Sequence, residues 1–167
     1  MAALDIPEAS GGAEVPEWIH LAPAGMARTF DDRGPYLIKD PQAIIAASFA
    51  DHDEIEIDIS HASFKAAPRG DEAPSQGWIT EMQAREDGIW GRVEWTDDGH
   101  RRVASRAYRR ISPAFEIDRT DGMTVLSILN ASLVNRNNLR GLTALNQEND
   151  NMSFQAILAA QLGLKAD

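Results

Sequence analysis

Residues 77–95 read GWITEMQAREDGIWGRVEW, in which a tight-turn signal lies between two strand-like runs. The Asp-Gly pair at residues 87–88 is typical of a hairpin turn, because glycine readily adopts the positive φ that such turns need. The runs on either side, near 77–84 and 89–95, carry the apolar and aromatic residues that suit strands. We therefore predict a β-hairpin here.

A second Asp-Gly pair, at residues 121–122, predicts another hairpin. Its first strand is expected over 108–117. Its second strand, over 123–135, is rich enough in apolar residues to be buried on both faces.

Further elements lie upstream of the first hairpin. Residues 54–60 alternate acidic side chains with isoleucines, the period-two pattern of a strand with one wet and one buried face, and this strand ends at His61. Helices are predicted where Asp40 precedes Pro41, and from Thr96 or Asp97 to about residue 107. Residues 64–76 indicate a surface loop.

Composition limits the possible classes of protein. A chain of 167 residues with 43% hydrophobic content is enough for one domain with a real core. The net charge of −10 argues against nucleic acid as the partner, and no apolar run approaches the ~20 residues needed to cross a bilayer. The absence of cysteine excludes disulfides, thiolate metal sites and a cysteine nucleophile. The histidines lack metal-site spacing, so no metal or other cofactor is expected.

Two residues suggest acyl-transfer chemistry. His61 closes an apolar strand, and Ser112 lies inside the strand over 108–117. A histidine can take the proton of a serine hydroxyl and return it to a leaving amine. Alternation along the strand places Ser112 and Arg110 on the face opposite the apolar residues. Pro113, which lacks an N–H, fits a sheet edge or bulge where a substrate strand could lie.

Several short sequence segments, in the same order along the chain, resemble the Mu-like phage protease family, also called Mu-like prophage I protein. They are EWIHLAPAG at 17–25, RGPY at 33–36, DPQAIIAAS at 40–48, DISH at 58–61, GWI at 77–79, DGIWGRVEWT at 87–96, YRRISPAF at 108–115 and SLVN at 132–135. The resemblance implies a capsid-maturation (prohead) serine protease, related to herpesvirus assemblins. It implies an α+β fold: a mostly antiparallel, β-barrel-like core with flanking helices.

The resemblance also implies a mechanism and a setting. Ser112 would be the nucleophile and His61 the general base of a serine endopeptidase that cleaves scaffold protein and itself. The expected partners are the phage scaffold protein, with the major capsid protein as a further candidate, and self-association is expected. The expected location is the host cytoplasm, inside the assembling prohead, with no membrane and no nucleic acid bound. The alternative is a catalytically weak or inactive scaffold or assembly module.

The third member of the catalytic group is the open point. Related proteases carry an acidic residue or a histidine there, and the matching strand offers Asn130, whose amide can accept a hydrogen bond from the imidazole. Asp58 competes with it, although on a regular strand it would face away from His61. Asn130 is preferred over Asp58.

The expected organisation has three parts. Residues 1–16 form a flexible arm, 17–146 the protease domain, and 147–167 a linker and the start of a scaffold-like helix. Five arginines at 101, 102, 106, 109 and 110 are best explained as a solvated surface. The alternative, left open, is that Arg109 and Arg110 position a substrate near Ser112.

Overall fold

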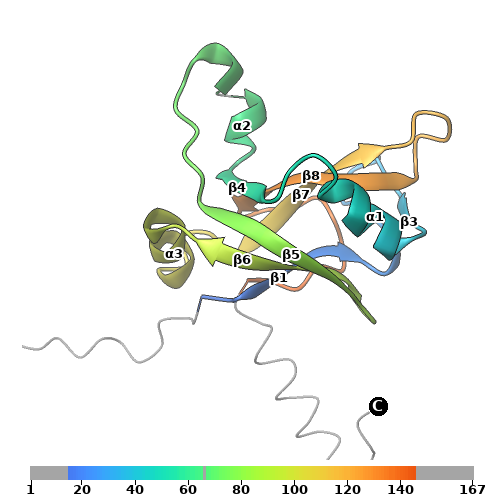
Figure 1. Cartoon of the computed structure of the whole chain (residues 1–167), viewed down its shortest axis with the longest axis horizontal. Coiled ribbons are helices and arrows are strands. Elements are labelled where there is room, and N and C mark those ends of the chain that lie inside the picture. The colour runs from blue at the N-terminus through green and yellow to red at the C-terminus, as the bar shows by residue number, and fades with distance from the viewer. Residues whose placement is uncertain (1–14, 66, 146–167) are drawn as a thin grey trace, which may run out of the picture.

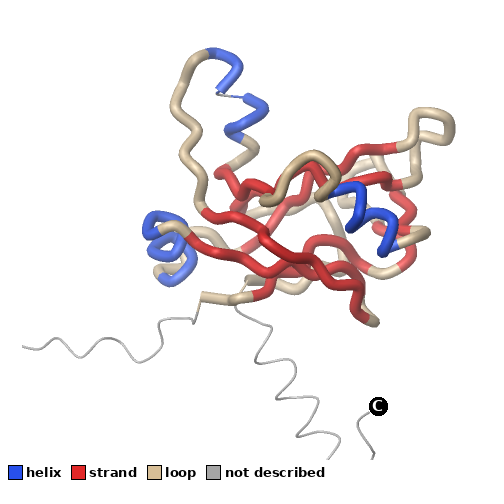
Figure 2. The backbone as a smooth tube through the Cα atoms, viewed as in Figure 1, coloured by secondary structure: helices blue, strands red, loops and turns tan. Residues whose placement is uncertain are grey.

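The computed structural model describes residues 15–65 and 67–145 of the chain, and it is built mainly of strands (Figures 1 and 2). The strands are β1 (Trp18–Pro23), β2 (Gly25–Ala27), β3 (Tyr36–Ile38), β4 (Ile55–Ile59), β5 (Gly77–Arg85), β6 (Gly88–Trp95), β7 (Arg110–Ile117) and β8 (Val125–Val134). The helices are α1 (Pro41–Ser48), α2 (Ala62–Lys65) and α3 (Asp97–Ala104), with a short 3-10 helix, η1 (Ala67–Arg69).

Six strands form one sheet in the order β1-β6-β5-β4-β8-β7, and β2 pairs with β3. Every neighbouring pair is antiparallel except β4 and β8, which are parallel. The first and last strands of the large sheet, β1 and β7, approach each other, so that the sheet nearly closes on itself (Figure 1). The expected α+β fold, with a mostly antiparallel barrel-like core and flanking helices, is confirmed.

The hairpin predicted over residues 77–95 is present as β5 and β6, and Glu86 and Asp87 form its turn. Gly88 has a φ of 131°, and a Cβ at this position would lie 1.8 Å from the carbonyl oxygen of Ala22 on β1. Glycine is therefore required here both by the turn and by the close approach of the neighbouring strand.

Both predicted helix starts are confirmed. The carboxylate of Asp40 accepts a hydrogen bond from the backbone N–H of Ala43 at 3.1 Å, and Thr96 Oγ1 accepts one from the N–H of Gly99 at the same distance. The second helix, α3, ends at Ala104 rather than near residue 107. Arg106 follows with a φ of 61°, a left-handed conformation that stops the helix.

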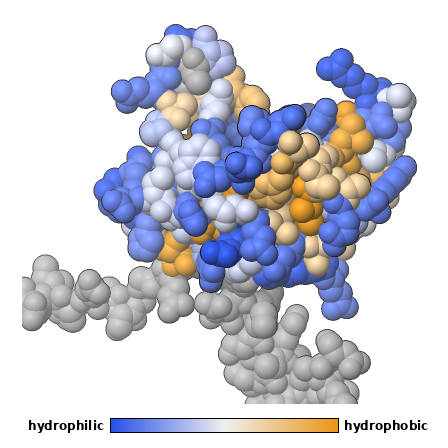
Figure 3. Space-filling model, in the orientation of Figure 1, coloured by the Kyte–Doolittle hydropathy of each residue, from blue (hydrophilic) through white to orange (hydrophobic). Residues whose placement is uncertain are grey.

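The strand β8 differs from its prediction. Leu126 and Leu129 are 41% and 51% exposed, so burial on both faces was wrong. The register with β7 skips these two residues: Asn130 pairs with Ala114, Ile128 with Phe115, and Val125 with Ile117. Each leucine is the extra residue of a bulge and turns outward. Figure 3 shows an apolar area, edged by hydrophilic side chains, on the face that carries α1.

Two predicted segments lie outside the described residues: nearly all of the arm over 1–16, and the linker and helix over 147–167. The segment 64–76, predicted as a loop, contains the end of α2 and all of η1, which project from the sheet (Figure 1). No helix in the described ranges is long and apolar enough to span a membrane.

Candidate active site

Three polar side chains form a row across three adjacent strands. Ser132 on β8 pairs with Asp58 on β4 on one side and with Ser112 on β7 on the other. Residues that pair directly across neighbouring strands share a face of the sheet, at a spacing of about 4.8 Å between strands. Asp58, Ser132 and Ser112 therefore point to the same side, in that order.

His61 reaches this row because β4 ends in an unusual turn. Ser60 and His61 have φ angles of 51° and 60°, in the left-handed region that few residues other than glycine adopt. The turn brings the backbone N–H of His61 to 3.1 Å from Ser132 Oγ, where it donates a hydrogen bond. The imidazole is thereby held beside the row rather than directed away from it.

The imidazole bridges two serines of the row. Its Nε2 lies 3.1 Å from Ser112 Oγ, and its Nδ1 lies 3.0 Å from Ser132 Oγ. The two residues singled out from the sequence, His61 and Ser112, are thus within hydrogen-bonding distance although 51 residues separate them in the chain.

The hydrogen bonds of Ser132 determine which imidazole nitrogen carries the proton. A hydroxyl has one proton to donate, and a carboxylate has none. Ser132 therefore donates its proton to the carboxylate of Asp58. Ser132 Oγ must then accept from His61 Nδ1, which is therefore protonated. The free lone pair of Nε2 faces the hydroxyl of Ser112, the arrangement that a general base requires.

Asp58 is fully buried and hydrogen-bonded on both carboxylate oxygens. Ser132 donates to Oδ1, while Asn130 Nδ2 at 3.2 Å and the backbone N–H of Ser63 at 3.0 Å donate to Oδ2. A buried carboxylate needs such partners, because an unpaired charge in the interior is strongly unfavourable. Ser63 lies in the short helix α2, so this helix also fixes the position of Asp58 at one end of the row.

The expected contact between Asn130 and His61 is absent. Asn130 Oδ1, the atom expected to accept from the imidazole, has no hydrogen-bond partner among the described residues, while Nδ2 donates to Asp58. The register explains this, because Asn130 precedes Ser132 by two residues on β8 and so lies on the side of Asp58 away from His61. Asp58, the competing candidate, is the residue linked to the imidazole, through Ser132.

Burial lowers the pKa of His61 below its usual 6.5. The negative charge of Asp58 opposes this effect, whereas the positive charges of Lys65 and Arg33 add to it. The imidazole is consequently neutral at pH 7, which is the form that accepts a proton.

Sequence reasoning missed Ser132, which lies at the centre of the row and links His61 to Asp58. The available signal was a polar residue close to Asn130 within the otherwise apolar run ASLV at 131–134. Its partnership with Asp58 depends on the parallel pairing of β4 and β8, which no local pattern shows.

Another histidine has a different environment. His20 is buried, stacks on Trp90 with ring centroids 4.7 Å apart, and accepts from the backbone N–H of Thr143 at 3.1 Å. Its Nε2 donates to the carbonyl oxygen of Asp87 at 2.9 Å. Both ring nitrogens are therefore used in packing β1 against its neighbours. In the described part of the chain, no three histidine, aspartate or glutamate side chains gather as metal ligands would.

The fold and the row together define a barrel-like α+β protein with a serine and a histidine poised for proton transfer. Comparison with known families matches residues 19–146 to the Mu-like prophage I protein, N-terminal domain. This match covers well over half of the chain, which therefore belongs to the Mu-like prophage I protein family and is a phage-related protein. No curated protein and no solved structure matches the chain.

Proposed function

We propose that this protein is a serine endopeptidase of phage capsid (prohead) maturation, which cleaves the scaffold protein and itself. The observation that carries the proposal is the 3.1 Å contact between His61 Nε2 and Ser112 Oγ, with Nδ1 held by Ser132. Membership of a phage protein family supports the setting. The prohead interior, the scaffold and the major capsid protein as substrates, and self-association all belong to the proposal.

The proposed reaction proceeds in two acyl-transfer steps. Ser112 Oγ attacks the peptide carbonyl while His61 Nε2 takes its proton, and the imidazolium then protonates the leaving amine. Water hydrolyses the acyl-enzyme, with His61 again acting as base and then as acid. During each step Nδ1–H donates to Ser132, whose own proton is directed at Asp58, so the buried carboxylate faces the developing positive charge through one hydroxyl.

The test compares the wild-type chain with Ser112→Ala. Each purified protein is incubated alone and with full-length scaffold protein, and intact masses are followed over time. A fluorophosphonate probe, which phosphonylates activated serines with loss of fluoride, is applied in parallel and the modified residue is mapped. Ser105→Ala is the matched control, because this serine is exposed, ends α3 and lies outside the row.

We expect fragments and probe labelling with the wild type and with Ser105→Ala, and neither with Ser112→Ala. Fragments that persist unchanged in Ser112→Ala would rule out Ser112 as the nucleophile. The absence of both fragments and labelling in the wild type would favour the alternative, an inactive scaffold or assembly module that retains the fold.

A further inference from the structure

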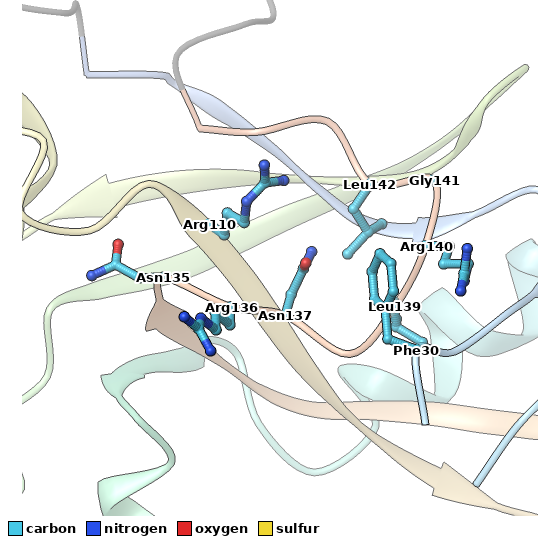
Figure 4. Close-up of a pocket in the computed structure, with 9 residues that line it drawn as sticks. All are labelled: Phe30, Arg110, Asn135, Arg136, Asn137, Leu139, Arg140, Gly141 and Leu142. Carbon is cyan, nitrogen blue, oxygen red and sulfur yellow. The ribbon is translucent and has the colours of Figure 1, made fainter. Parts of the chain in front are cut away.

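An arginine-lined pocket opens beside the strand that carries Ser112. Its volume is about 530 Å³, and it lies between the start of β7, the segment that follows β8, and Phe30 (Figure 4). Arg110, Arg136 and Arg140 line it together with Leu139 and Leu142. In Figure 4 the arginine of β7 and the two arginines of the later segment stand around Asn137 and the apolar side chains.

The positive charge of this pocket is not neutralised by the residues that line it. None of the lining residues is acidic, in a chain whose net charge is −10. Arg110 and Arg136 form no ion pair with any described residue, and Arg140 is held by Phe30, 4.3 Å from the ring centroid, and by the carbonyl oxygen of Thr29. By contrast, Arg101 and Arg102 on α3 both pair with Asp98, as expected of a solvated surface.

One residue of the pocket, Arg110, lies on the same strand as Ser112, which does not itself line the pocket. Arg110 and Ser112 are two residues apart on β7, so they share a face and lie about 6.6 Å apart along the strand. Ile111 between them is buried in the core, which directs both of its neighbours outward. In the described residues β7 is paired only with β8 in the large sheet, while β1 approaches it and the N–H of Leu145 donates to the carbonyl oxygen of Arg109 just before it, so the substrate is proposed to enter beside Ser112, beyond that contact.

We propose that this pocket binds an acidic side chain, aspartate or glutamate, of a peptide substrate about two residues from the bond that Ser112 attacks. The inference rests on the proposed endopeptidase function, because it names the substrate class of the same site. Guanidinium groups form charge-assisted, often bidentate hydrogen bonds to carboxylates, and Leu139 and Leu142 offer contact to the methylene groups of a glutamate. An extended substrate rises by the same distance per residue as β7, which sets the position of the acid.

The first experiment measures specificity. Peptides from a Lys-C digest of a bacterial proteome are incubated with the wild-type protein, and the new termini are mapped. The best substrate is then synthesised with glutamate and with glutamine at the acidic position. We expect a preference of about tenfold in kcat/KM for glutamate, the size of one partly exposed charge-assisted pair, and its loss in Arg110→Gln. Arg119→Gln, in the exposed turn at the far end of β7, should leave the preference unchanged. Cleavage sites without any acid preference, or a preference that survives in Arg110→Gln, would overturn the proposal.

The second experiment does not depend on catalysis. The Ser112→Ala protein is titrated with alanine-serine dodecapeptides that carry a single glutamate at varied positions, and with the corresponding glutamine peptides, while the arginine Nε–H signals are followed by NMR. If the signals of Arg110 and Arg136 shift with the glutamate peptides but not with the glutamine peptides, the pocket binds an acidic side chain as proposed. This holds even if no cleavage is ever detected, in which case only the endopeptidase function fails. Equal responses to both peptides, no response, or displacement of the peptides by an equal concentration of a single-stranded 12-mer oligonucleotide would overturn it.

Discussion

Replacing Ser132 by alanine tests the central contact of the row. Ser132 is fully buried, and its Oγ accepts from the backbone N–H and from Nδ1 of His61 and donates to Asp58. Ser132→Ala leaves these three groups without that partner. A buried polar group that loses its partner costs about 1–3 kcal/mol, and since His61 is only half-buried we expect a total of about 3–5 kcal/mol. A domain with about 10 kcal/mol of stability, the middle of the usual range, still folds after such a loss.

The activity should fall further than the stability suggests. Without Ser132, nothing fixes the proton on Nδ1, and the link from the imidazolium to Asp58 is broken. Converting the orienting carboxylate of a serine protease to an amide lowers kcat by about 10⁴. Because the orienting group here is one hydroxyl removed from the carboxylate, we expect kcat/KM to fall by about 10²–10³.

The assays separate positioning from folding. The measurements are kcat/KM against a cleaved peptide, the rate of fluorophosphonate labelling at Ser112, and the Tm by calorimetry. The control is Ser127→Ala, on the same strand: this serine is also buried and donates to Glu116 at 2.8 Å, but it is remote from the imidazole. Ser127→Ala should lower the Tm, because it removes one buried hydrogen bond. It should leave kcat/KM within about threefold of the wild-type value, because the bond does not involve His61.

A pH profile adds a measurement that a purely structural role would not change. Ser132→Ala removes the acceptor of the Nδ1–H, a hydrogen bond that is stronger to the charged imidazole than to the neutral one, so the pKa of His61 should fall further in this variant. The acid limb of the kcat/KM profile should then move to lower pH. A folded Ser132→Ala protein that keeps its activity within threefold and its pH profile unchanged would refute the relay.

Three further outcomes are expected. Asn130→Ala should destabilise the fold by about 1–3 kcal/mol in denaturant titration, through its lost hydrogen bond to a buried carboxylate, yet reduce kcat/KM less than Ser132→Ala, since Asn130 does not contact His61. In the wild type, burial lowers the pKa of His61, so protonation inactivates the base only below pH 6.5, and the half-maximum of kcat/KM should lie below that pH. Gly99→Ala should lower the Tm by several degrees, because its Cβ would lie 1.7 Å from the carbonyl oxygen of Gln76; an unchanged Tm would contradict this packing.

The elements that could be predicted from the sequence are those set by local chemistry. The hairpin turn predicted from Asp87-Gly88, which lies at Glu86 and Asp87, and the caps at Asp40 and Thr96 act within a few residues, and all three are present. The outward turn of Leu126 and Leu129 depends instead on bulges that form against β7, and such register shifts leave no mark in the composition of the strand.

In the candidate site, too, some residues could be predicted from local sequence and others depend on contacts between distant strands. His61 and Ser112 could be found without coordinates because they are a chemically reactive pair and lie in segments that resemble a known family. The group that orients the imidazole could not, because it follows from the parallel register of β4 and β8 and from the left-handed turn at Ser60. On a regular strand Asp58 and His61 would face opposite sides; the turn removes that objection and makes Asn130 unnecessary as the orienter.

A hydroxyl between imidazole and carboxylate has a physical consequence for the rate. The hydroxyl can fix the tautomer of His61 as well as a carboxylate can, because that requires only an acceptor at Nδ1. It is weaker in stabilising the imidazolium: at an effective dielectric constant of about 20, opposite charges attract by about 6 kcal/mol at ~2.8 Å and about 3 kcal/mol at ~5 Å. Three donors hold that more distant carboxylate fixed in place. The row therefore favours orientation over charge stabilisation, and this predicts that the proposed endopeptidase is slower than one with a direct histidine-carboxylate contact, and is suited to substrates held near it at high local concentration.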